Sequence, residues 1–194
     1  MANKDAAMGL KVHKHGGGGT VRMTGYKIAS AYTVSIFSGD PVITSGTGKE
    51  VQIGTAGGNI VGVFAGCEYT TTDGVEHFSR YWPASTTLKT GTKGTAWVYD
   101  DPQIQFVVQA VTDGTGITAA MIGQLADLTI GTGSTATGQS TGELTAPAGA
   151  ETQVRILELL DHPNNAYGEH AKVVVQIGEH ELLANSANEG LSEV

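Results

Sequence analysis

Cys67 and His77 are of residue types that together could form a catalytic pair. A cysteine thiolate becomes a nucleophile when a histidine base lies within hydrogen-bond reach. The two residues fall on segments that we expect to be neighbouring strands, so a small hydrolase is one hypothesis. Cys67, however, follows the apolar run 59–65, where a buried and inert thiol is the usual state. No G-x-S-x-G nucleophile elbow occurs. We therefore predict a protein that is not an enzyme and has no catalytic residues.

Metal and phosphate chemistry have equally weak support in the sequence. His13 and His15 lie beside a run of four glycines, which leaves the two imidazoles without a preorganised geometry. The single cysteine excludes a cysteine-based zinc cluster and an intrachain disulfide. The glycines of residues 131–138 match no nucleotide-binding motif. Asp100 and Asp101 are adjacent, so on a strand they point to opposite faces. We expect no metal site and no cofactor.

Aromatic residues at the expected strand ends form the remaining group with chemical potential. Such side chains anchor protein interfaces, stack on glycans or pack in a core. All three roles stay open at this point. The candidates for interface anchors are Tyr81, Trp82, Trp97 and Tyr99.

The charge of the chain is distributed unevenly. Residues 1–27 carry five basic residues against Asp5, a local charge of +4, which leaves −12 for the rest of a chain whose total is −8. An acidic body repels nucleic acid. A basic segment ahead of it suits docking onto an acidic protein surface, and a solvated terminus is the alternative. No run approaches the roughly 20 apolar residues of a membrane span. We expect no nucleic-acid or membrane partner, and no signal peptide.

The composition predicts short strands joined by tight turns. Glycine accounts for 28 of 194 residues and charged residues for 15%, against about 25% in an average domain. Alternating or continuous apolar runs bounded by turn residues mark the strands. Gly66 indicates a bulge within one long strand. The expected strands are 21–28, 32–37, 41–44, 49–53, 59–65 continuing through 67–71, 75–81, 95–99, 104–110, 152–160 and 172–177.

Two segments fall outside this pattern. Met121, Ile122, Leu125 and Leu128 recur at helical spacing, which predicts one short helix over 118–128. Residues 131–150 are rich in small polar residues and predict a long loop or β-excursion with little core.

The many expected strands predict an all-β chain. A small barrel or sandwich is the expected architecture, because closure of the sheet removes its exposed edges.

We expect a single domain flanked by two terminal segments. Residues 1–19 are predicted to form an extended N-terminal arm with a glycine hinge at 16–19. Residues 20–183 form the β-rich domain. Residues 184–194 form a flexible acidic C-terminal tail.

Several ordered segments resemble one family of viral proteins. The stretches that carry the likeness are 26–30 (YKIAS), 36–42 (IFSGDPV), 60–67 (IVGVFAGC), 81–84 (YWPA), 98–102 (VYDDP) and 171–175 (AKVVV). Together they resemble the head decoration, or cement, proteins of tailed bacteriophages. The resemblance covers most of residues 20–180. It contains no catalytic motif.

The resemblance implies a structural role on the phage head. Such a protein is made in the host bacterial cytoplasm, binds the major capsid protein on the outer surface of the virion and associates with copies of itself as a trimer or dimer. A head fibre or glycan-adhesion protein on the virion surface is the alternative. The candidates for capsid contact are Lys11, His13, Lys14, His15, Arg22 and Tyr26.

Overall fold

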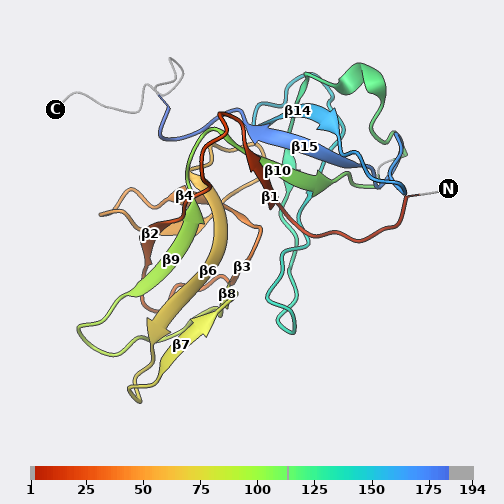
Figure 1. The fold of residues 1–194 in the computed structure, drawn as a ribbon. Coiled ribbons are helices and arrows are strands. Elements are labelled where there is room, and N and C mark those ends of the chain that lie inside the picture. The colour runs from red at the N-terminus through yellow and green to blue at the C-terminus, as the bar shows by residue number, and fades with distance from the viewer. Residues whose placement is uncertain (1–2, 113, 184–194) are drawn as a thin grey trace.

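The computed structural model describes residues 3–112 and 114–183, and these form almost entirely antiparallel β-structure (Figure 1). The predicted all-β class is confirmed. The predicted C-terminal tail, residues 184–194, lies outside the described residues. The elements are β1 Lys11–His15, β2 Thr24–Ile28, β3 Ile36–Phe37, β4 Pro41–Thr44, β5 Val51–Ile53, β6 Gly62–Thr70, β7 Glu76–Ser79, β8 Tyr81–Trp82, β9 Gly94–Tyr99, β10 Ile104–Gln109, the 3₁₀ turn η1 Ala119–Met121, β11 Leu125–Ala126, β12 Leu128–Thr129, β13 Glu143–Leu144, β14 Val154–Leu159 and β15 Lys172–Ile177.

Two larger sheets form two lobes. One has the order β1-β10-β15-β14-β11, and the other has the order β2-β9-β6-β4-β5 with β7 added to β6. Figure 1 shows the first in the upper part of the molecule and the second below it. The short pairs β3-β8 and β12-β13 complete the structure.

The second sheet curls so that β5 returns to the side of β2. The backbone N–H of Lys27 donates to the carbonyl of Lys49 over 3.0 Å, and Lys27 also forms an isolated bridge with Glu50. A closed barrel needs a continuous series of hydrogen bonds between its first and last strands, and here one isolated bridge joins β2 to the segment before β5. The predicted barrel is therefore not closed.

Each lobe has its own hydrophobic core, and residues 60–64, which lead into the start of β6, contribute to both. Ile60 and Val63 belong to the core of the first sheet, whereas Val61 and Phe64 belong to that of the second. All four side chains are at most 1% exposed. The predicted central buried strand is confirmed, and so is its bulge, because the register with β9 shifts between Phe64 and Gly66.

The N-terminal arm is a correction to the sequence prediction. Residues 11–15 form β1, the edge strand that pairs with β10, and Leu10 is 4% exposed in the first core. The glycine run forms a turn instead of a hinge, since Gly16 N–H donates to the carbonyl of Gln103 and Gly18 N–H to that of His15. The described part of the arm is therefore built into the domain.

The predicted helix over 118–128 is also wrong. Only Ala119–Met121 form a 3₁₀ turn, and Gly123 has a φ of +88°, a left-handed conformation that ends the turn. Two short strands follow, with Ala126 and Leu128 buried in the first core. The four apolar residues at helical spacing therefore belong to different elements: Met121 ends the 3₁₀ turn, Ile122 follows it, and Leu125 and Leu128 lie on β11 and β12.

Residues 131–150 form a β-excursion that holds more core than predicted. Leu144 is fully buried in the first core. The part around residue 138 extends to the second lobe, where Ser38 N–H donates to the carbonyl of Gly138 and Ser140 N–H to that of Ser38, each over 3.0 Å. This excursion links the two lobes.

Candidate interaction surface

The four predicted anchor residues do not lie together. Trp82 is fully buried in the second core. Its ring packs edge-on against that of Tyr69, with the two ring centroids 5.1 Å apart. Tyr81 stacks on Phe37 at 5.3 Å, and Tyr99 packs against the first core. The prediction of an interface anchor is thus wrong for Trp82, whose ring no partner can reach in the folded chain.

Trp97 is the exception, because it lies on the outside of the curled sheet. On β9 its neighbours Ala96 and Val98 are fully buried, so the alternation of the strand directs Trp97 outward. Its cross-strand partners are Gly25 on β2 and Gly66 on β6. A β-carbon at Gly25 would lie 3.6 Å from the indole, so the ring covers this glycine. Because glycine has no side chain, these two cross-strand neighbours leave part of the indole exposed, and Trp97 is 36% exposed.

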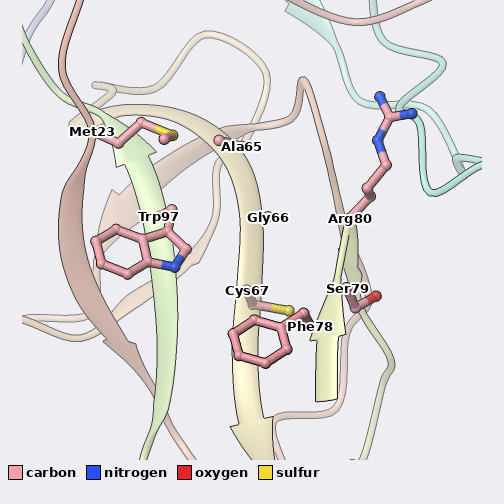
Figure 2. A pocket seen from close by; sticks show the side chains of 8 residues that line it. All are labelled: Met23, Ala65, Gly66, Cys67, Phe78, Ser79, Arg80 and Trp97. Carbon is pink, nitrogen blue, oxygen red and sulfur yellow. The ribbon is translucent and has the colours of Figure 1, made fainter.

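Met23 and Phe78 extend this apolar surface (Figure 2). Phe78 on β7 is 75% exposed, Met23 is 49% exposed and Trp97 is 36% exposed. With Gly66 and Arg80 they line a shallow pocket of about 350 Å³. We call Met23, Gly66, Phe78, Arg80 and Trp97 the aromatic face. Exposed aromatic groups gathered around a hollow are typical of interaction sites.

Cys67 lies beneath the aromatic face and is not poised for catalysis. Cys67 is 3% exposed, and its thiol donates to the carbonyl of Tyr81 over 3.4 Å. Burial raises its pKa to about 12, so the thiol stays protonated at neutral pH. His77 stacks instead on Tyr69 at 5.2 Å, and its Nε2 lies 3.3 Å from the Thr71 hydroxyl. No hydrogen bond joins Cys67 to His77 in the described structure.

The basic residues predicted to touch the capsid have two different environments. Lys11, His13 and Arg22 are exposed, and Lys14 is paired with Glu158 at 3.3 Å on the surface. These four residues remain accessible to a partner. His15 is not, because only 12% of its side chain is exposed.

His15 organises the glycine turn. Its Nδ1 accepts hydrogen bonds from the N–H groups of Gly17 and Gly19 at 3.1 and 3.0 Å. Nε2 lies 3.1 Å from Asp101 Oδ2, so Nε2 carries the proton and donates to the carboxylate. The imidazole thereby joins the turn to the loop before β10. Its role in the structure is internal, which corrects its place among the contact candidates.

Tyr26 is likewise an internal residue. It is 5% exposed, and its hydroxyl donates to Asp100 Oδ2 over 2.9 Å. Burial, together with the Asp100 carboxylate, raises its pKa. The Lys49 ammonium lies 4.8 Å from the centre of its ring. A capsid contact through Tyr26 is inconsistent with this burial.

Comparisons of the chain with protein-family models, with curated proteins and with solved structures found no match. Among residues 3–112 and 114–183, no helix has the length and hydropathy to cross a membrane.

Proposed function

We propose that this chain is a structural protein of a bacteriophage head that binds the outer surface of the assembled capsid and stabilises it. The observation that carries the proposal is the aromatic face on the outside of the curled sheet. Phe78, at 75% exposure, and the exposed Trp97 leave apolar surface in contact with water, which does not stabilise a monomer. A protein that docks onto a partner uses such side chains as anchors.

The β1 edge supplies a second surface of suitable charge. Lys11 and His13 are exposed on it, and the register with β10 is irregular between Val12 and Lys14. A bulge and lysines discourage uncontrolled strand addition at a sheet edge. The lysines of β1, Lys11 and Lys14, form a basic strip along this edge that suits an acidic protein surface. The major capsid protein is the partner we propose, and copies of this chain associate on the same shell.

The direct test is the composition of purified virions of the phage that encodes the chain. Quantitative mass spectrometry is expected to find it in a near-stoichiometric ratio to the shell protein. Its absence from the virions would reject the proposal.

A glycan-binding protein of the virion surface is the second candidate, and Trp97 is the observation that favours it. An exposed indole at a hollow can stack on a sugar ring. The decisive variant is Trp97→Ala, because Trp82 is buried. Glycan-array binding that disappears in Trp97→Ala would support adhesion, whereas binding of capsids with no glycan signal would support the capsid role.

A further inference from the structure

Asp5, Glu143 and His170 meet on the first lobe although they are far apart in the sequence. One possible ligand atom from each lies within 4.8 Å of the other two. His170 Nδ1 lies 3.7 Å from Asp5 Oδ1. Ligand atoms around a tetrahedral zinc ion lie about 3.3 Å apart, given bonds of about 2.0–2.2 Å. Small side-chain rotations would therefore close this triad on an ion.

Buried Gln109 fixes the backbone on both sides of Asp5. Its Oε1 accepts from Ala6 N–H at 2.8 Å, and its Nε2 donates to the carbonyl of Lys4 at 2.7 Å. The same Nε2 donates to the carbonyl of His170 at 3.1 Å. One fully buried amide thus holds the segments that carry two of the three side chains.

Asn3 reinforces this attachment. Its side-chain amide donates to the carbonyls of Ala166 and Glu169 at 2.8 Å each, and its Oδ1 accepts from Ala166 N–H at 2.9 Å. The N-terminal segment is therefore clamped to the loop before β15. These hydrogen bonds hold the backbone segments that carry Asp5 and His170 next to each other.

The three side chains differ in exposure. The Asp5 side chain is 71% exposed and free to rotate, whereas that of His170 is 18% exposed. Thr112 Oγ1 lies 2.8 Å from His170 Nε2 and 3.4 Å from Nδ1, so the hydroxyl is nearer to Nε2, and Nδ1 is the nitrogen near Asp5. Glu143 is half-buried on β13, and its carboxylate accepts no hydrogen bond from the part of the chain that the structure describes.

The charges also favour a cation. Two carboxylates and one imidazole come together in this cluster. One imidazole nitrogen and two carboxylate oxygens form a donor set that suits zinc and related divalent transition metals.

We propose that Asp5, Glu143 and His170 bind a divalent transition-metal ion of the zinc type, which fastens the N-terminal segment to β13 and to the loop before β15. Three protein ligands leave at least one position for water. The inference is independent of capsid binding.

The test is calorimetric titration of the full chain, freed of metal by chelation, with Zn²⁺. One ion per chain is expected, and Asp5→Asn, Glu143→Gln and His170→Ala each weaken binding at least about 10-fold, a loss that even outer-shell changes can produce. The control is His13→Ala, which alters the exposed histidine on β1 and is expected to bind as the wild type does. Zn²⁺ is also expected to raise the melting temperature of the wild type but not of Asp5→Asn.

Because Asp5 is on the surface, Asp5→Asn is expected to unfold at the wild-type urea midpoint in the presence of EDTA. This measurement separates loss of a ligand from loss of the fold. Wild-type zinc affinity in Asp5→Asn, or no saturable zinc binding by the wild type, would overturn the proposal. Loss of binding in His13→Ala would place the metal at β1 and would also overturn it.

Discussion

At the scale of single residues, Asp40 is a carboxyl group whose buried surroundings disfavour its charged form. It is fully buried, and burial raises its pKa from 3.8 to about 6, although Phe37 N–H donates to Oδ2 over 2.7 Å. Near pH 7 the folded chain therefore contains a buried carboxylate. Such a group destabilises the fold.

The sign of its pH dependence follows from this shift. The folded chain holds the Asp40 proton more tightly than the unfolded chain, so the free energy of unfolding falls as pH rises from about 4 to about 6. The full effect is about 3 kcal/mol at 1.36 kcal/mol per pKa unit. Asp40→Asn keeps an acceptor for Phe37 N–H and removes the titration. Urea unfolding at pH 8 is expected to show the variant as more stable than the wild type.

The same comparison at pH 4.5 supplies the control for Asp40→Asn. The advantage of the variant should shrink there, because the wild-type carboxyl is then mostly protonated when folded. An equal difference at both pH values would contradict the assignment.

His15 provides a second prediction at this scale. His15→Ala removes one hydrogen bond to Asp101 and two from the glycine turn, and about 1 kcal/mol each predicts a loss of about 2–3 kcal/mol in unfolding free energy. The matched control is exposed His13→Ala, for which almost no change is expected. Chemical denaturation measures the free energy of unfolding of both variants. Equal values would contradict the role of His15 in stabilising the glycine turn.

At the scale of elements, individual strands were predictable and distant pairings were not. The strands β4, β5, β14 and β15, and the strand β6 with its bulge, were predicted from sequence patterns, and the structure confirms them. The pairing of β1 with β10 joins segments about 90 residues apart, so no turn residue signals it. Basic residues along β1 also concealed the buried Leu10 at its start.

The candidate surface was predicted only in part for the same reason. Trp97 was singled out by its residue type, whereas Met23 and Phe78 were not. Phe78 becomes part of the aromatic face only because β7 pairs with β6 and directs it outward opposite Glu68. Asp5, Glu143 and His170 have no ligand spacing at all, and folding alone brings them together.

The 131–150 excursion gives an element-scale prediction. A β-carbon at Gly133 would overlap the ring of Phe37, and Gly133 also has a left-handed φ of +67°. Gly133→Ala is expected to destabilise the chain by the cost of the left-handed residue and by about 1–3 kcal/mol of overpacking. Gly46→Ala is the control, because Gly46 has a φ of +75° but no atom within 4 Å of its β-carbon position. Equal losses in thermal unfolding would show that the excursion does not pack on β3.

At the scale of the whole molecule, the two lobes share strands and form one unit. The segment 60–64 contributes to both cores, and the side chain of Gln153 joins β12 to residues 55 and 58 through three hydrogen bonds of 2.8–2.9 Å. The incorporation of β1 into this unit changes how the basic surface must be tested. Deletion of residues 1–19 would remove an edge strand and Leu10, and it would report stability and not binding.

Charge reversal tests the basic strip without removing β1. Lys11→Glu combined with Lys14→Glu is expected to weaken capsid binding most strongly at low salt, because exposed charges act through screened attraction. The surface pair of Lys14 with Glu158 contributes at most about 1 kcal/mol, so the fold is retained. Sedimentation with capsids at two salt concentrations measures the effect. Unchanged binding at both concentrations would show that β1 does not contact the capsid.

The central claim is that the aromatic face binds the capsid, and co-sedimentation with capsids that lack the chain tests it most directly. The variant is Trp97→Ser combined with Phe78→Ser, and the control is Val34→Ser, which removes an apolar side chain with 43% exposure elsewhere. Interface anchors typically contribute 2 kcal/mol or more, so the double variant should lose at least about 30-fold in affinity. The control should bind as the wild type does. Wild-type binding by the double variant, with its fold intact, would contradict the account.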